Sequence, residues 1–582
     1  MNIEKIFNQE NSIYETWRLC NAEHGELTAI EYFGNTVTYK RMDEIIDLYA
    51  RAFMAMLPDK TRSVTVCLAA MPVAAFVFYA LNKIGVRVNY VSPAVMASDP
   101  KKYLDVNDTE ILVLLDGFFS ALSEGIKTTA LKNMVVVSLA DGIVTIPDYV
   151  PASIRARLKR ADAIPKIKEA LPQMRVLSLD EFLTIGRQSM ETVPSLYTKG
   201  DSAVVLYTGG STGIPKGVEK TNEEFLSLAR VYNQNGDMDH ECGDRFLVVV
   251  PPNHPTGLVH NVIMPGFYGA TMIFQPFYDK NTFADDLCHT KATFAVGAPS
   301  HYATFPLSDL PDGALSHLRW AYCGGEPVSE QMANSVNAAM KRLGVQNPYL
   351  VVGYGMSEVG PVVFLTRGRP DLINKVGPPM RGALARIVDD HGHEVGNNVL
   401  GNIELKTNCT MKCYYKQPEL TKAFFTDDGY AKTLDMGIRD DNGDYDILGR
   451  AEDWVAGPDG SKVYLFHIER VVYKDPAVLE TEVVGLEING RKEPVVHIVL
   501  QPDFKGRNEE VIVRVHKLCQ EHLTKNQMPR GYKVRETFGT NAVSQKRDWK
   551  ALLLEHDGYC LVEGETVREV NFRREAASSQ VS

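Results

Sequence analysis

The chain has 582 residues, more than one hydrophobic core usually serves, so its length predicts several domains. A net charge of −11 excludes a broad basic face for nucleic acid, and 45% apolar with 23% charged residues is typical of a soluble globular protein. Nine cysteines are scattered along the chain, and no His or Cys pair near Cys409 and Cys413 completes a zinc site. We therefore expect free thiols in a reducing, cytoplasmic location.

The first half of the chain alternates short apolar runs with helical patterns. The runs expected to be strands are residues 63–70, 86–91, 110–116, 133–139, 203–208, 246–252, 270–276 and 293–300. Val64–Leu81 is about long enough to mimic a membrane span, but Pro72 divides it. Because proline is tolerated at the start of a helix, we expect a buried strand followed by a buried helix, and no span. The alternation predicts an α/β fold with largely parallel sheets and helices on their faces.

Three regions depart from this pattern. Residues 117–199 are charged and less regular, like an insertion, and their basic cluster at 155–160 is expected to be a solvated helix face. The segments 401–410, 428–437, 443–449 and 462–469 alternate and carry turns, which predicts a small antiparallel, barrel-like unit. The runs 483–488 and 494–502 and the helical stretch 509–523 suffice for a small α+β domain. We expect domains at 1–450 and 451–582.

One loop carries most of the chemical information. Val204–Gly217 reads VVLYTGGSTGIPKG, an apolar strand followed by glycine, serine and threonine residues and then Pro215 and Lys216. Such a loop exposes many backbone N–H groups and suits a polyphosphate. It fails the spacing G-x-x-x-x-G-K-[ST] of the P-loop NTPases. A plain surface turn is the alternative for this segment alone.

Further motifs appear in order along the chain. They are GGEPV at 324–328, GYGMSE at 353–358, TLDMGIRDDNGDYDILGR at 433–450 and NAVSQKRDWKAL at 541–552. Together with the loop they resemble the ANL superfamily of adenylate-forming enzymes, the AMP-dependent synthetases and ligases, and are most similar to acyl-CoA synthetases. The resemblance extends from TVTYKRMDEI, near residue 40, to Leu552. This sequence departs from the family pattern at Leu434, Ser357, His467 and Gln545, where glycine, threonine, glutamate and glycine are usual.

The resemblance implies that ATP and Mg²⁺ activate a carboxylic acid as an acyl-adenylate with release of pyrophosphate. The implied ATP-binding residues are Thr208, Gly209, Gly210, Ser211, Thr212, Gly213, Gly324, Gly325, Glu326, Pro327, Tyr354, Gly355, Met356, Asp435 and Arg450. Lys216 and Ser357 would contact phosphates, and Glu358 would bind Mg²⁺. Glu452 would be the hinge of a mobile C-terminal domain that brings Lys546 to the α-phosphate. Out of context, Glu358, Asp435 and Lys546 would be a loop carboxylate, a turn aspartate and a surface lysine.

The acid and the acceptor are less constrained. His254, in PPNHPTGL, would lie beside the acyl pocket by the same resemblance; a satisfied histidine at the start of a loop is the alternative. No aspartate occurs between Asp244 and Asp279, so an acid without an α-amino group is expected. Gly460 and Ser461 would contact CoA, the expected acceptor.

Two other hypotheses stay open at this point. One is a stand-alone adenylating enzyme that loads a carrier protein or an amine. The other is a weakened nucleotide-binding protein that has lost catalysis. The sequence also leaves a homodimer open, and it implies no nucleic-acid partner.

Overall fold

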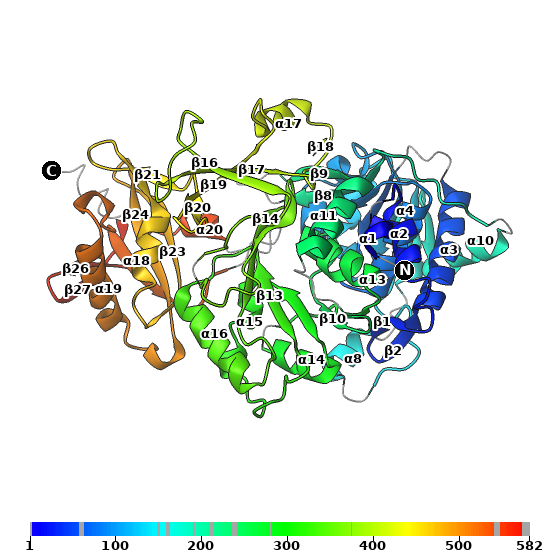
Figure 1. Cartoon of the computed structure of the whole chain (residues 1–582), viewed down its shortest axis with the longest axis horizontal. Coiled ribbons are helices and arrows are strands. Elements are labelled where there is room, and N and C mark those ends of the chain that lie inside the picture. The colour runs from blue at the N-terminus through cyan, green and yellow to red at the C-terminus, as the bar shows by residue number, and fades with distance from the viewer. Residues whose placement is uncertain are drawn as a thin grey trace.

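The structure is a computed structural model that describes residues 3–7, 9–57, 63–147, 150, 152–158, 163–189, 192–208, 215–235, 241–279, 281–373, 375–539 and 548–572. Within these residues the chain forms two eight-stranded sheets, a four-stranded sheet, a two-stranded hairpin and a five-stranded sheet. Figure 1 shows α19 (Asn508–His522) at one end of the molecule and α3 (Tyr39–Met56) at the other. The α/β fold class expected from the sequence is confirmed.

Sheet 1 is parallel except at one edge. In spatial order its strands are β18 (Cys413–Tyr414), β9 (Lys216–Thr221), β8 (Ser202–Thr208), β4 (Val88–Tyr90), β3 (Ser63–Cys67), β5 (Thr109–Leu115), β6 (Asn133–Val137) and β7 (Arg175–Ser178). The strands from β8 to β7 are parallel, and β9 and β18 are antiparallel additions. Sheet 1 contains five of the eight runs expected to be strands.

Sheet 2 has the same plan. Its order is β15 (Gly360–Leu365), β14 (Val351–Met356), β13 (Trp320–Gly324), β12 (Phe294–Gly297), β10 (Arg245–Val248), β11 (Thr271–Phe274), β1 (Thr28–Tyr32) and β2 (Asn35–Thr38). The interior strands are parallel, and β15 and β2 are antiparallel edges. The remaining three expected strands are β10, β11 and β12, so all eight are confirmed.

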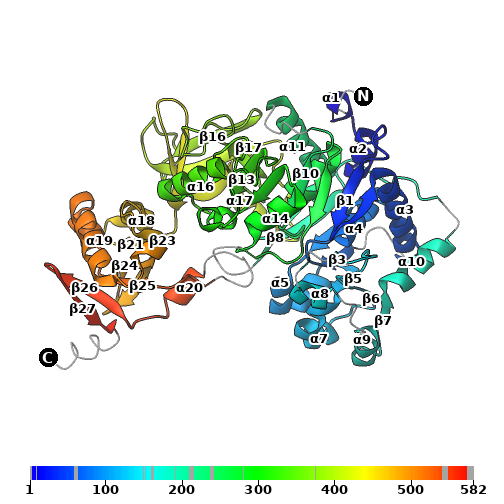
Figure 2. The same ribbon diagram turned by 90° about the horizontal axis from the view of Figure 1, so that it is seen from below.

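Helix α4 (Pro72–Lys83) lies between the two sheets. Pro72 is its first residue, and every residue of the helix is buried. The hydrophobic core around α4 contains Val64 of sheet 1 and Ile30 of sheet 2. Figure 2 shows α4 between β1 and β3. Val64–Leu81 is therefore a strand followed by a core helix, as expected. Among the residues that the structure describes, no helix is long and apolar enough to cross a membrane.

Other helices cover the outer faces of both sheets. Leu112 and Leu114 of β5 pack with α5, α6, α7 and α9, and Ile273 of β11 packs with α14 and α16. The described helices of the first 300 residues are α1 (Ile3–Phe7), α2 (Ile13–Cys20), α3, α4, α5 (Pro93–Ser98), α6 (Pro100–Leu104), α7 (Phe119–Lys127), α8 (Ala152–Arg157), α9 (Ile164–Ala170), α10 (Leu179–Gln188), α11 (Asn222–Asn235), α12 (Pro255–Leu258), the π-turn Val259–Ile263, α13 (Met264–Phe267) and α14 (Phe283–Thr290). Those that follow are α15 (Pro299–Tyr302), α16 (Glu330–Arg342), α17 (Pro418–Phe424), α18 (Leu465–Val472), α19 and α20 (Trp549–Leu552).

The interpretation of residues 117–199 as an insertion is wrong. They supply β6 and β7, two strands of sheet 1, together with α7 to α10. Arg157, in α8, stacks over the ring of Phe277 with its guanidinium carbon 3.9 Å from the ring centre, so this part of the basic cluster contacts the protein. The region looked irregular because its short helices are rich in charge and because β7 is short and only partly buried.

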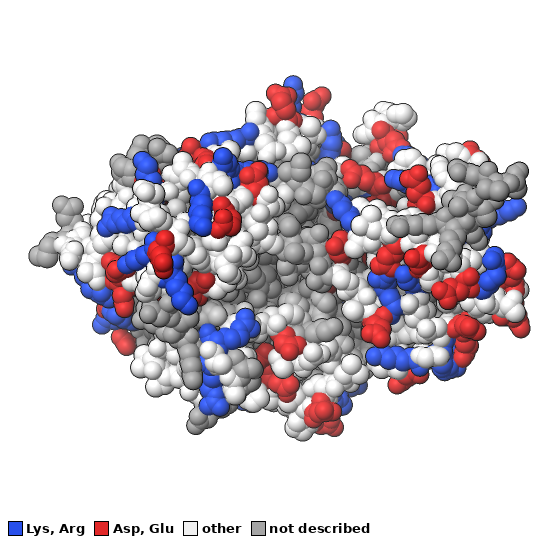
Figure 3. All heavy atoms as spheres, turned by 180° about the vertical axis from the view of Figure 1, so that it is seen from behind, with Lys and Arg blue, Asp and Glu red and all other residues white. Residues whose placement is uncertain are grey.

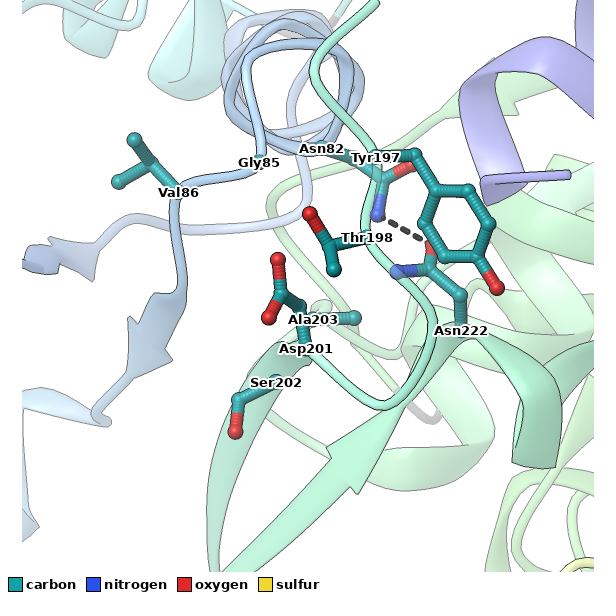
Figure 4. Close-up of a pocket in the computed structure, with 9 residues that line it drawn as sticks. All are labelled: Asn82, Gly85, Val86, Tyr197, Thr198, Asp201, Ser202, Ala203 and Asn222. Atoms are coloured by element: carbon teal, nitrogen blue, oxygen red, sulfur yellow. Dashed lines mark hydrogen bonds between the residues drawn. The ribbon is translucent and has the colours of Figure 1, made fainter. Parts of the chain in front are cut away.

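Polar side chains at the point where α2, α4 and α11 meet border a small cavity (Figure 4). Asn82 Nδ2 donates to Asn222 Oδ1 at 2.8 Å, and these two side chains also accept the backbone N–H groups of Tyr14 and Ile13. These are the first N–H groups of α2, which lack partners inside the helix. The cavity of about 10 Å³ holds one water molecule at most and is too small for a substrate.

Residues 383–450 form the small antiparallel sheet. Its order is β16 (Ala383–Val388), β17 (Gly401–Thr407), β19 (Ala431–Arg439) and β20 (Tyr445–Arg450). The expected antiparallel unit is confirmed for these strands, but the segment 462–469 does not belong to it. That segment contributes β22 (Lys462–Tyr464), which pairs with β21 (Trp454–Ala456), and then enters α18. Its apolar residues Leu465, Phe466 and Ile468 fit helical spacing as well as alternation.

The residues after 450 have cores of their own. The five-stranded sheet comprises β23 (Val478–Ile488), β24 (Arg491–Leu500), β25 (Gly531–Arg535), β26 (Tyr559–Glu563) and β27 (Thr566–Val570), and α18 and α19 pack on it. Arg470 pairs with Asp446 at 2.9 Å, and Lys462 pairs with Asp390 at 2.9 Å. A few polar contacts of this kind join the two parts, which is compatible with the predicted boundary at 450/451.

Leu434 has a strained backbone at the centre of the small sheet. Its φ is +61°, and the register between β17 and β19 shifts beside it. The irregularity turns Asp435 inward, where its N–H donates to Thr433 Oγ1, and Ala451 N donates to Leu434 O at 2.9 Å. A left-handed conformation costs an L-residue roughly 1–2 kcal/mol, and glycine avoids this cost.

We expect Leu434→Gly to stabilise the protein by about 0.5–1 kcal/mol, because relief of the strain exceeds the entropic cost of glycine. Thermal and urea denaturation measure the change. Leu384→Gly, at an exposed position of β16 without a positive φ, is the control and should destabilise by a similar amount. Equal destabilisation by both variants would contradict the prediction.

Candidate active site

The glycine-rich loop joins two paired strands. Thr208, the last residue of β8, pairs with Lys216, the first residue of β9. Gly209, Gly210, Ser211, Thr212 and Gly213 lie outside the described residues. The pairing places Lys216 at the base of the loop, where its Nζ lies 5.5 Å from the ring centre of Tyr414. The ammonium group of Lys216 therefore belongs to the residue at the base of the loop.

Two motifs meet at the ends of adjacent parallel strands. Gly324, at the end of β13, lies opposite Gly353 in β14, and a Cβ at Gly324 would approach the Gly353 carbonyl oxygen to 2.6 Å. Glycine at position 324 is therefore needed for this close approach of the two strands. Gly325, Glu326 and Pro327 follow β13, and Tyr354, Gly355 and Met356 complete β14. Ligands of parallel α/β sheets bind outside the carboxyl ends of the strands, which is where these residues lie.

Glu358 lies in the turn between β14 and β15, and Ser357 precedes it. Glu358 is only 7% exposed, and its Oε1 accepts a hydrogen bond from Tyr414 Oη at 2.9 Å. Burial and the Glu358 carboxylate raise the pKa of Tyr414 above its ordinary value, so the phenol stays a donor at neutral pH. Tyr414 thus contacts the carboxylate with its hydroxyl and Lys216 with its ring. The structure brings the two predicted phosphate-site residues together.

Asp435 and Arg450 face each other across β19 and β20. Arg450 Nη1 donates to Asp435 Oδ1 at 2.8 Å, and Tyr354 Oη donates to the other carboxylate oxygen. Asp435 is 9% exposed. Burial, followed by the Asp435 charge, raises the pKa of Tyr354 well above its ordinary value. A buried carboxylate held by a cation and a phenol is a ready acceptor for neighbouring hydroxyl groups.

The other predicted site residues lie apart from this cluster or outside the described residues. His254 is exposed, and its Nδ1 accepts the Thr256 N–H at 3.2 Å, which caps α12. Glu452 is exposed just after β20. Gly460 and Ser461 form the turn between β21 and β22, where Gly460 has φ +80° and Ser461 Oγ donates to Asp459. Lys546 lies outside the described residues.

Tyr414 is the site residue that sequence reasoning missed. It is in β18, a two-residue strand that no motif contains and that is 56 residues from Glu358. No local pattern marks it, because its role depends on the pairing of β18 with β9. Among the described residues there is no group of three or more His, Cys, Asp or Glu side chains that would hold a metal ion. One carboxylate, Glu358, fits a Mg²⁺ ion that arrives with phosphate oxygens as its other ligands.

Charged side chains elsewhere are mixed. On the face shown in Figure 3, Lys and Arg are interspersed with Asp and Glu.

All nine cysteines are free, as expected, and burial raises the pKa of Cys409 to about 11. The buried thiols are therefore protonated and unreactive at neutral pH.

Known proteins resemble the chain over most of its length. A family described as AMP-binding enzyme matches residues 17–415. A long-chain-fatty-acid–CoA ligase of Salmonella typhimurium is 24% identical over 92% of this chain and 93% of its own. A sulfoacetate–CoA ligase of Cupriavidus necator is 25% identical over 69% and 81%.

Solved structures share the fold. A benzoate CoA ligase of Burkholderia xenovorans has a TM-score of 0.76 at 18% identity, covering 93% of this chain and 99% of that protein. An amide bond synthetase of Marinactinospora thermotolerans has a TM-score of 0.74 at 19% identity, covering 93% and 99%. These structures share the α/β architecture of this chain, a large part with parallel sheets and a smaller C-terminal part. The match over more than half of its length shows that this chain belongs to the AMP-binding enzyme family.

We expect Tyr414→Phe to weaken ATP binding about tenfold, because a hydrogen bond to a carboxylate contributes roughly 1.5 kcal/mol. The phenyl ring stays beside Lys216, so packing is kept. Calorimetric titration with MgATP measures the change. Tyr415→Phe is the matched control: it removes the hydroxyl that accepts from Arg87, and its ATP affinity should stay within about twofold. Similar losses in both variants would show a general effect of the strand.

Proposed function

We propose that the protein is an AMP-forming acid–CoA ligase. It activates a carboxylic acid with ATP as an acyl-adenylate, releases pyrophosphate and transfers the acyl group to CoA. The observation that carries the proposal is the arrangement around β14. Tyr354 in this strand donates to Asp435, the proposed ribose acceptor. Glu358, just beyond the strand, accepts from Tyr414, whose ring lies beside Lys216 at the proposed phosphate end.

The chemistry needs placement and charge compensation. A carboxylate oxygen of the acid attacks the α-phosphorus, and the bond to pyrophosphate breaks with its electrons going to the leaving group. Lys216 offsets charge on the leaving phosphates, and Ser357 provides a hydroxyl to the α-phosphate. Asp435 accepts the ribose hydroxyls, and Arg450 keeps its carboxylate in place. Glu358 would hold Mg²⁺, which neutralises phosphate charge when bound.

We propose two domains, residues 1–450 and 451–582, with the hinge at Glu452. In one pose the second domain brings Lys546 to the α-phosphate, and in the other the Gly460–Ser461 turn faces the route of CoA. Support comes from the separate cores after residue 450 and from Ala451, whose N–H is held by Leu434 next to Asp435. The proposed hinge residue Glu452 thus lies two residues beyond the proposed nucleotide contact Arg450.

The acid is proposed to bind near the start of α12, beside His254. The related ligases named above act on a long-chain fatty acid and on sulfoacetate. Because these acids differ widely, membership of the family does not identify the acid that this protein uses. A pyrophosphate-release screen over short, long-chain, aromatic and dicarboxylic acids, with and without CoA, tests the function. Acid-dependent release together with an acyl-CoA product supports it. Acid-dependent release with product only on a carrier protein or amine favours the alternative acceptor, and no release with any acid contradicts adenylation.

We expect Lys546→Ala to slow adenylation about 10²–10³-fold, because the variant lacks the preorganised cation at the α-phosphate. Transfer of the acyl group from preformed acyl-adenylate to CoA should change less than about threefold. Pyrophosphate release and thioester formation, assayed separately, measure the two steps. Lys550→Ala, in α20, is the control and should leave both within about twofold. Equal loss in both half-reactions would show that Lys546 has no special role in adenylation.

A further inference from the structure

Lys220 is a buried cation next to the proposed metal site. Its residue is 3% exposed, and its Nζ donates to the Cys409 carbonyl oxygen at 2.5 Å. Burying an ammonium group costs several kcal/mol unless other groups compensate it. An apolar side chain of similar length would fill the same space without that cost. The contact of this ammonium therefore needs a physical explanation.

The strand places Lys220 on the same face as the phosphate-site residues. Side chains two apart in a strand share a face, so Lys216, Val218 and Lys220 point the same way from β9. Tyr414 pairs directly with Val218, and its hydroxyl reaches Glu358. The two lysines thus flank the position where Tyr414 crosses to the carboxylate.

The carbonyl that Lys220 holds belongs to a loop that clamps Glu358. In this loop, residues 407–411, Met411 N donates to Glu358 O at 2.5 Å and Thr407 Oγ1 donates to Val359 O at 2.6 Å. Cys409 N in turn donates to Thr407 Oγ1 at 3.1 Å. Lys220 binds the middle of the 407–411 loop, at Cys409, and the two ends of the loop donate to the carbonyl oxygens of Glu358 and Val359. The loop therefore connects Lys220 to the backbone at Glu358.

The charges around Lys220 fit a role beside a carboxylate. Glu224, one turn into α11, faces Lys220, and burial raises the pKa of Glu224 to about 7 although Lys220 and the Thr221 N–H oppose the rise. Burial lowers the pKa of Lys220, and the charges of Glu224 and Glu358 counteract this. Arg230 is the other cation that acts on Cys409. The charges of two carboxylates thus favour the ammonium form of Lys220, while its hydrogen bond goes to the loop.

We propose that Lys220 is a positioning residue for the metal carboxylate: it anchors the 407–411 loop, and the loop fixes the backbone of Glu358. The proposal rests on the proposed function, in which Glu358 binds the metal of the metal–ATP complex. In this proposal the two lysines of β9 have different roles. Lys216 lies beside the phosphates, and Lys220 lies behind the metal ligand Glu358. Residues that orient a metal ligand typically change metal affinity about 10–100-fold when replaced.

The test measures Mn²⁺ binding by electron paramagnetic resonance in the presence of α,β-methylene-ATP, which cannot be cleaved between its α and β phosphorus atoms. We expect Lys220→Met to raise the dissociation constant for Mn²⁺ about tenfold, and Lys220→Arg, which keeps charge and donors, to change it less than about threefold. Lys412→Met is the matched control. Lys412 follows the loop directly, but its Nζ donates to Gly200 O on the exposed side, so we expect less than a twofold change.

A second variant keeps the test decisive if Lys220→Met folds poorly. Thr407→Val removes the hydroxyl that holds Val359 while keeping the shape of the side chain. It should also weaken Mn²⁺ binding, and the double variant should be no weaker than Lys220→Met alone, because both act through one loop. Additive effects, or a lower melting temperature in either variant with unchanged Mn²⁺ binding, would overturn the proposal. Failure of the unchanged protein to bind Mn²⁺ with the nucleotide would instead count against the proposed function.

Discussion

The hydrogen bond from Tyr354 to Asp435 connects the two parts of the site, and the rest of the arrangement depends on it. Tyr354 belongs to sheet 2, whereas Asp435 belongs to the small antiparallel sheet. Glu358 is four residues beyond Tyr354, so at most ~14 Å of chain separates the phosphate-end carboxylate from the ribose-end tyrosine. A nucleotide bound along this edge would therefore contact groups whose spacing is set by one strand. The small antiparallel sheet supplies Asp435, the proposed ribose acceptor, at the other end.

The same carboxylate connects the nucleotide site to the proposed hinge. Arg450 pairs with Asp435, and the next residue, Ala451, donates its N–H to Leu434. Leu434 keeps a positive φ because the chain must turn Asp435 inward and also present its own carbonyl to Ala451. Strain of this size persists only where surrounding contacts hold it in place. Here the bonds from Arg450 to Asp435 and from Ala451 to Leu434 do so, and they connect the proposed ribose contact to the residues just before the proposed hinge, Glu452.

The fold was largely predictable because its strands are buried on both faces. A continuous apolar run such as 110–116 does not fit a sheet with one exposed face, so it predicts a strand buried on both faces. Pro72 marks the start of α4 because proline lacks the N–H that a helix interior needs. The segment 462–469 was misassigned because short apolar stretches satisfy helical and strand spacing equally well. Residues 117–199 were misread because their charged helices hid the strand β7 and made the expected strand at 133–139, β6, look like part of an insertion, although β6 pairs with β5 and β7 pairs with β6.

The site was predictable where a motif is continuous and unpredictable where distant segments meet. Gly324 is visible in sequence, and its close approach to the Gly353 carbonyl oxygen explains why no side chain fits there. Tyr414 and Lys220 carry no such signal, since their proposed functions depend on β18 and β9 lying side by side. Sequence alone would place Lys220 at the surface, because a lone lysine is usually solvated. Its burial is possible because Glu224 and the 407–411 loop lie next to it, and those neighbours are brought there by folding of the whole domain.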